Sequence, residues 1–120
     1  MPNERLVDLT IRAARTSDAA ALATLMCELG YETSTAEMQK RLERVVRDSR
    51  YRAFVAEEQR TIRGMIGTFA YHTFEHDDLS GRILELVVSK RSRRSGIGRR
   101  LISAAEGKRT SRKETSGASR

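Results

Sequence analysis

An apolar strand that runs into a basic, glycine-containing turn is the feature that most constrains this chain. Residues 83–88 (ILELVV) hold a single charged residue, Glu85. Such a nearly continuous apolar run predicts a strand in the centre of a sheet. Residues 90–94 (KRSRR) predict a turn, and residues 96–98 (GIG) lead into a helical pattern that Gly107 closes. We therefore expect a strand, a turn and a helix in direct succession here.

The residues upstream of this unit predict one strand, two amphipathic helices and two more strands. Gly30 is placed to end the first helix, and Ser34 with Glu37 forms a capping box at the start of the second. The expected strands are 9–13, 53–56, 62–74 and 83–88, and the helical apolar spacings cover 22–29, 38–46 and 99–105. The predicted fold is therefore α/β, of the α+β type, in the order β-α-α-β-β-β-α.

Length and composition indicate one domain without a membrane span. The chain has 120 residues, of which 38% are hydrophobic and 32% charged. No run approaches the roughly 18 apolar residues of a transmembrane helix, and the first residues lack the apolar segment of a secretory signal. The single cysteine, Cys27, excludes an internal disulfide, so we expect a reducing, cytoplasmic location. One cysteine and two histidines also argue against a metal site.

The positive charge is concentrated at the end of the chain. Residues 1–89 hold 12 Lys and Arg against 14 Asp and Glu, whereas residues 90–120 hold 11 against 2. This distribution predicts an anionic partner for the C-terminal part. Residues 108–120 contain no large apolar side chain, so we expect a domain over 1–107 and a disordered basic tail over 108–120.

The turn before the last helix has the composition of a phosphate-binding loop. Gly96 and Gly98 allow the backbone to approach a ligand closely, and the free N–H groups of a helix start attract anions. The loop lacks the Gly-Lys-Ser/Thr ending of a Walker motif, and Leu101 stands where a dinucleotide fingerprint needs a third glycine. The sequence favours anion binding over a helix start that merely contains two glycines.

Residues 88–102 resemble the acetyl-CoA signature of the GNAT (Gcn5-related) N-acetyltransferase superfamily. In that signature a strand is followed by Arg/Gln-x-x-Gly-x-Gly/Ala and a helix, and Arg93, Gly96 and Gly98 occupy its fixed positions. The order of the elements over residues 9–106 is also similar. The resemblance implies an acyl-CoA N-acyltransferase-like fold with a mixed, mostly antiparallel sheet. It also implies a C-terminal truncation, because the family's later strands do not fit into 13 polar residues.

The resemblance implies roles for particular residues and an acetyl-CoA co-substrate, with no metal. Loop amides would hold the CoA pyrophosphate, backbone groups of the preceding strand would pair with the pantetheine arm, and a strand N–H would stabilise the oxyanion. The implied acetyl-CoA contacts are Val87, Val88, Arg93, Arg94, Ser95, Gly96, Ile97, Gly98 and Arg99.

Three residues are candidates for the amine side of the reaction. Glu85 is the candidate general base, since it is the one acid in an apolar strand, and a merely ion-paired or edge-facing glutamate is the alternative. Tyr31 and Glu32 lie in the turn between the first two helices, where the resemblance implies an acceptor pocket for a small-molecule or peptide amine.

The expected function is transfer of an acetyl group from acetyl-CoA to a primary amine by direct attack. Two alternatives stay open: a non-catalytic remnant of the fold, and a basic nucleic-acid-binding module over residues 90–120. The module is the less favoured alternative, because residues 90–120 lack aromatic side chains for stacking on bases. Without a fifth strand, the apolar edge of strand 83–88 is expected to be exposed, and a homodimer through that edge is one consequence.

Overall fold

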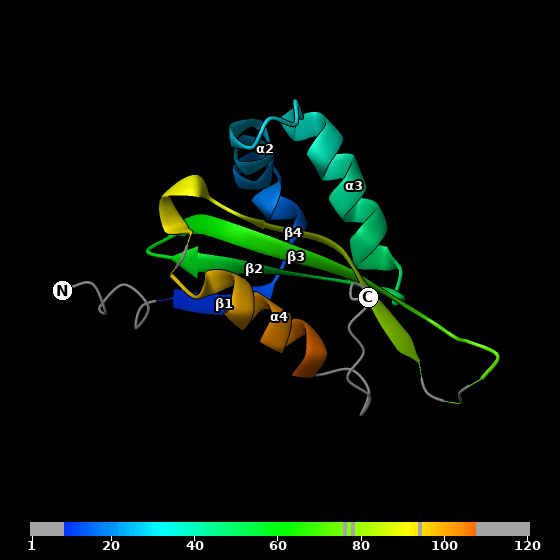
Figure 1. The fold of residues 1–120 in the computed structure, drawn as a ribbon. Coiled ribbons are helices and arrows are strands. Elements are labelled where there is room, and N and C mark those ends of the chain that lie inside the picture. Colours follow the sequence, from blue (N-terminus) through cyan, green and yellow to red (C-terminus); the bar gives the residue numbers. More distant parts are fainter. Residues whose placement is uncertain (1–8, 76, 78, 94, 108–120) are drawn as a thin grey trace.

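The computed structural model describes residues 9–75, 77, 79–93 and 95–107. Its core is a four-stranded antiparallel sheet in the order β1-β2-β3-β4, with helices on both faces (Figure 1). Helices α2 and α3 cover one face, and α4 covers the other. The strands are β1 (Leu9–Ala13), β2 (Tyr51–Glu58), β3 (Thr61–Tyr71) and β4 (Ser80–Val88); the helices are α2 (Ala19–Glu28), α3 (Thr35–Arg47) and α4 (Ile97–Gly107), and short 3-10 turns are η1 (Thr16–Asp18) and η2 (Lys90–Ser92).

The predicted order β-α-α-β-β-β-α is confirmed, and the local signals that end and start the first two helices act as expected. Gly30 adopts a φ of +96° after α2, and the N–H of Tyr31 donates to the carbonyl of Met26 at 2.9 Å. At the start of α3 the N–H of Glu37 donates to Ser34 Oγ at 3.0 Å, and the N–H of Ser34 donates to Glu37 Oε1 at 2.9 Å. The α2–α3 hairpin is therefore defined by its own short-range sequence.

Each face of the sheet has its own apolar core. On one face, α2 and α3 pack their apolar residues, among them Leu22 and Leu42, against Val55 and Met65 of the sheet. On the other face, α4 packs Leu101 against a cluster that includes Ile66 and Phe54. Val46, which the helical spacing placed on the apolar side of α3, is instead 56% exposed, because the apolar arc of the helix ends at Val45.

Helix α4 lies directly on the backbone of β3 at Gly64. A Cβ atom at this position would lie 2.8 Å from the carbonyl oxygen of Val87 and 3.3 Å from Leu101 Cδ1. Only glycine fits there, because real Cβ atoms do not approach a backbone oxygen so closely. The start of α4 and the end of β4 are therefore held in contact with the same residue of β3.

The prediction that β4 lies in the centre of the sheet is wrong. Within the described residues β4 pairs only with β3, and Leu84 and Leu86 are 53% and 38% exposed. The pairing also slips: Glu85 faces Gly67 and Ile83 faces Thr68, so that Leu84 has no partner on β3. The apolar run reflects surfaces beside the strand rather than burial by two neighbouring strands.

An ion-pair network ties β1 and β2 to the start of α2. The guanidinium of Arg12 contacts both carboxylate oxygens of Asp18, at 2.8 and 3.0 Å, and Glu57 Oε1 at 2.9 Å. Burial alone would raise the pKa of Asp18, but hydrogen bonds from Arg12 and from the N–H of Arg15 hold that pKa below its ordinary value. Asp18 thus supports the β1–α2 corner instead of capping the helix with its side chain.

Helix α4 ends at Gly107, and the domain boundary expected at that residue stays a prediction. The tail predicted over 108–120 lies outside the described residues. None of the helices that the structure describes is both long and apolar enough to cross a bilayer.

Candidate functional site

The candidate anion site forms where η2 leads into α4. Gly96 has a φ of +88°, a backbone conformation that side chains other than glycine rarely adopt, and its carbonyl accepts the N–H of Arg100 at 3.1 Å. The first-turn N–H groups of Ile97, Gly98 and Arg99 have no acceptor among the described residues, as at any uncapped helix start. Three amides and the positive end of an 11-residue helix are thus available to an anion.

The side chains of this turn differ in whether they are exposed to a ligand. The Ile97 side chain is buried in the α4 core, so only its N–H faces the site, and Ser95 Oγ donates to the carbonyl of Ser92. Arg93 is exposed, and its Nε donates to the carbonyl of Val88 at 3.4 Å. Arg94, also named from the sequence, lies outside the described residues. The charge available to an anion therefore includes the exposed side chains of Arg93 and Arg99.

An open groove of about 490 Å³ adjoins this turn. It runs between the end of α2 and the end of β4, and its lining residues are Leu29, Tyr31, Leu86, Val87, Val88, Lys90 and Arg93. The structure thus brings Tyr31, from the turn after α2, together with three of the implied acetyl-CoA contacts: Val87 and Val88 from β4, and Arg93 from the basic turn.

The backbone of β4 presents alternate residues to the groove. The N–H of Ser89 donates to the carbonyl of Arg63 in β3 at 2.7 Å, so the backbone N–H and C=O groups of Ser89 and Val87 face β3. By the same alternation, the N–H and C=O groups of Val88 and Leu86 point to the free edge. Val87 packs against the α2–α3 core, and Leu86, which the sequence analysis did not single out, lines the groove beside it.

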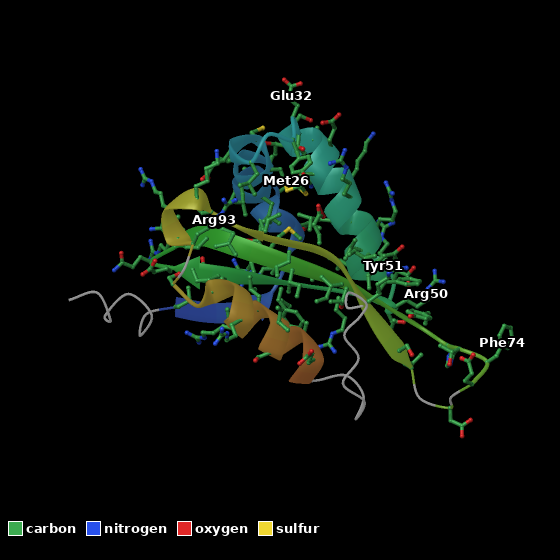
Figure 2. The ribbon with its side chains drawn as sticks, viewed as in Figure 1. Met26, Glu32, Arg50, Tyr51, Phe74 and Arg93 are labelled. Carbon is green, nitrogen blue, oxygen red and sulfur yellow. The ribbon has the colours of Figure 1, made fainter. Side chains whose placement is uncertain are left out.

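The other two candidates lie apart from this groove. Glu85 is exposed on the α2–α3 face of β4, where it lines a separate, more enclosed pocket of about 200 Å³. Glu32 is also exposed, and its side chain points away from the sheet at the top of the α2–α3 turn, far from Arg93 (Figure 2). Of the two residues predicted for the acceptor, only Tyr31 shares a lining surface with the β4 residues.

Glu28 is a site residue that the sequence analysis missed. Its Oε2 accepts the N–H of Lys90 at 3.0 Å and the hydroxyl of Ser89 at 3.4 Å, which fastens the start of the basic turn to the end of α2. The partners are separated by 62 residues of sequence. The one sequence signal for Glu28 is its position as the single charged residue of α2, at the last residue of that helix.

The described residues contain no group of three or more His, Cys, Asp or Glu side chains arranged to hold a metal ion. His72 lies just after β3, and His76, the other histidine of that hairpin, lies outside the described residues.

The arrangement of sheet, helices and basic turn defines a protein class: a mixed α/β domain with the acyl-CoA N-acyltransferase-like fold. A family model described as an acetyltransferase (GNAT) domain matches residues 14–118. The chain therefore belongs to the GNAT acetyltransferase family. No curated protein sequence matches it.

Solved structures of GNAT acetyltransferases have the same fold. A GNAT family acetyltransferase from Staphylococcus aureus is 26% identical with a TM-score of 0.76, over 83% of this chain and 76% of that one. An aminoglycoside acetyltransferase from an uncultured soil metagenomic sample, in complex with sisomicin, is 19% identical with a TM-score of 0.66, over 84% and 69%. Glucosamine-6-phosphate N-acetyltransferase from Arabidopsis thaliana is 22% identical with a TM-score of 0.67, over 80% and 70%. At under 25% identity, the latter two resemble this chain in fold alone.

Proposed function

We propose that this chain binds acetyl-CoA along the groove and transfers its acetyl group to a primary amine. The observation that carries the proposal is the junction of β4 and α4. A strand edge with outward backbone groups, a glycine at positive φ and three helix-start amides without described acceptors follow one another within 14 residues, 86–99. Family membership supports the same reading.

The residues of the groove and of the adjoining turn suit the parts of this ligand. The amides of Ile97, Gly98 and Arg99 would hold the diphosphate, with Arg93 adding charge. The outward backbone groups of Leu86 and Val88 would pair with the amides of the pantetheine arm, as an added strand would. When bound, acetyl-CoA supplies an activated acetyl thioester.

The chain's own contribution to the reaction is placement, proton removal and charge stabilisation. The neutral amine forms a bond to the acetyl carbon while the carbon–sulfur bond breaks, and CoA leaves as its thiolate. An outward N–H of β4 would stabilise the oxyanion. Glu85 lies two residues from Val87 on the same face of the strand, about 7 Å away, and would accept the amine's proton directly or through water.

Acetyl-CoA affinity tests the loop assignment through a pair of variants that differ only in charge. Gly96→Asp places a carboxylate where the diphosphate would lie, and Gly96→Asn places a neutral group of the same shape; asparagine tolerates positive φ comparatively well. By isothermal titration calorimetry, we expect Gly96→Asp to bind acetyl-CoA about 100-fold more weakly than Gly96→Asn.

The matched folding control is Gly30→Asp. Gly30 also has a positive φ, and a Cβ atom at either glycine would meet nothing within 4 Å, so both substitutions strain the backbone alike. Gly30→Asp should lower stability by about 1–2 kcal/mol and keep acetyl-CoA binding. Equal affinity of Gly96→Asp and Gly96→Asn would refute the loop assignment. Binding of acetyl-CoA without CoA release for any amine would identify the non-catalytic alternative.

A further inference from the structure

A second hollow lies on the α2–α3 face of the sheet, beside the strand that lines the groove. This pocket has a volume of about 200 Å³ and is bounded by α2, α3 and strands β2, β3 and β4. Met26 of α2 points from the helix toward the sheet, and Tyr51 lies near the far end of α3 (Figure 2). The pocket is thus framed by residues from five elements.

The pocket exists because β3 carries a glycine at its floor. A Cβ atom at Gly67 would meet only Met65 Cε, at 4.0 Å, so the space above Gly67 is open. Its partner across the ladder is Glu85, whose side chain therefore stands beside a position without one. The unpaired Leu84 adds its side chain to the same rim.

The walls of the pocket are apolar and adaptable. Three methionines, Met26, Met38 and Met65, line it together with aliphatic residues of α3 and the Tyr51 ring. Unbranched thioether side chains adjust to the shape of a ligand and contact aromatic rings favourably. The ionisable side chains at its lining include Glu85 and, from α3, Arg41.

We propose that this pocket receives the body of the acceptor, and that the acceptor is a small apolar monoamine whose ammonium group is held at Glu85. The proposal rests on the acetyltransferase function proposed above. An apolar protein cavity of about 150 Å³ holds one benzene molecule, so this pocket suits a single aryl or branched alkyl group. A polyamine or an aminoglycoside would bring several charges into apolar surroundings, which is strongly unfavourable.

The position of Glu85 joins this pocket to the groove. Glu85 faces the pocket, and Val87, two residues further on the same face, lines the groove. An amine held at Glu85 with its apolar group above Gly67 would therefore point its nitrogen along β4 toward the proposed thioester site. The structure gives the acceptor and the donor separate compartments along one strand.

Methionine-methyl NMR tests the pocket without relying on turnover. The chain has four methionines, of which three line the pocket, and the fourth, Met1, lies outside the described residues. In protein carrying 13C-methyl methionine, 2-phenylethylamine should shift the signals of Met26, Met38 and Met65, assigned by single Met→Leu variants. Spermidine at the same concentration should leave them in place. Unshifted signals with 2-phenylethylamine, or equal shifts with spermidine, would overturn the proposal.

A filled pocket gives the matching functional test. Gly67→Leu occupies the space above β3, and Gly107→Leu adds the same side chain at a helix end where a Cβ meets nothing within 4 Å. In a CoA-release assay, wild type should acetylate 2-phenylethylamine at least tenfold more efficiently (kcat/KM) than spermidine or kanamycin. Gly67→Leu should lose at least tenfold for that substrate while its acetyl-CoA Kd stays within about twofold, and Gly107→Leu should match wild type.

The outcomes separate this proposal from the one on which it rests. Methionine shifts without acetyl transfer would leave the pocket as an apolar amine site and refute the transferase function. Acetyl transfer to spermidine or kanamycin in preference to 2-phenylethylamine, or full activity of Gly67→Leu, would keep the transferase and refute the pocket assignment.

Discussion

The two sites along β4 differ in what forms them: main-chain groups dominate at the end of the strand, and side chains dominate in the pocket above Gly67. The anion turn that adjoins the groove is mainly a backbone site: its anion-binding groups are amides, its course depends on Gly96, and the Ile97 and Ser95 side chains are buried or used locally. The pocket above Gly67 is a side-chain site, whose shape depends on three methionines and on the absence of one side chain. We therefore expect the backbone site to hold the invariant part of the donor and the side-chain site to set which amine is accepted.

The strongest test of this contrast compares two glycines of β3. Gly64→Val should lower the free energy of unfolding by about 3 kcal/mol, because its Cβ would lie 2.8 Å from the Val87 carbonyl oxygen. Gly67→Val, three residues along, should change it by less than about 1 kcal/mol, since the space there is open. Urea denaturation followed by circular dichroism measures both. Equal stability of the two variants would contradict the close approach of β4 and α4 to Gly64.

Glu85→Gln separates the chemistry of the pocket from binding in the groove. Loss of the carboxylate should lower kcat by about 100-fold through loss of the base, with an unchanged acetyl-CoA Kd. Steady-state kinetics and calorimetry on the same preparation provide the two readouts. An unchanged kcat would exclude Glu85 as the general base. The KM for the amine in the same assay would then test its contact with the ammonium group.

Asp18→Asn should weaken the scaffold and spare both sites. Removing one partner of the largely buried Arg12 pair should lower the stability at pH 7 by about 2 kcal/mol. The native pKa of Asp18 lies below its ordinary value of 3.8. Its contribution is therefore fully present above that pH and is lost as the pH falls further through the native pKa.

Urea midpoints recorded between pH 7 and pH 2 check this prediction. Wild type should lose stability more steeply than Asp18→Asn below about pH 4, so that the two curves converge. Parallel curves would show that Asp18 carries no depressed pKa. Acetyl-CoA affinity at pH 7 serves as the control, because Arg12 and Asp18 lie outside the lining of the groove.

The smallest expected effect is that of Glu28→Gln on the groove. The substitution keeps the size of the side chain but weakens its hydrogen bond to the Lys90 N–H. Such a bond is worth about 1 kcal/mol, so the acetyl-CoA Kd should rise by at most about fivefold. Titration calorimetry resolves a change of this size. The affinity of 2-phenylethylamine for the pocket should stay the same, and a parallel loss there would show that the two hollows are not independent.

Local sequence was enough to predict much of the fold and the glycine turn before α4. Ser34, Glu37 and Gly30 act on neighbours within a few residues, so their patterns could be interpreted without tertiary structure. Gly96 belongs to the same group, because the turn and the helix that it starts are contiguous.

Features made by distant parts of the chain could not be predicted in the same way. The Glu28–Lys90 contact spans 62 residues, and the pocket draws its residues from five elements. The strand β4 was placed in the centre of the sheet because apolar residues usually indicate burial by neighbouring strands. Here Leu84 lines the pocket and Leu86 lines the groove. The apolar pattern of β4 therefore belongs to surfaces proposed for ligands and not to a buried core.

The bare backbone at Gly64 has a consequence for how the two ends of a long ligand are positioned. Leu101 Cδ1 and Ile97 Cγ2 of α4 would lie 3.3 and 3.4 Å from a Cβ atom at Gly64, so the helix packs these buried side chains directly on the backbone of β3. The spacing between the amides at the helix start and the exposed edge of the strand is therefore fixed by van der Waals contact. An acetyl-CoA molecule that contacts both the helix-start amides and the edge of β4 would therefore have its thioester held at one fixed position along the strand.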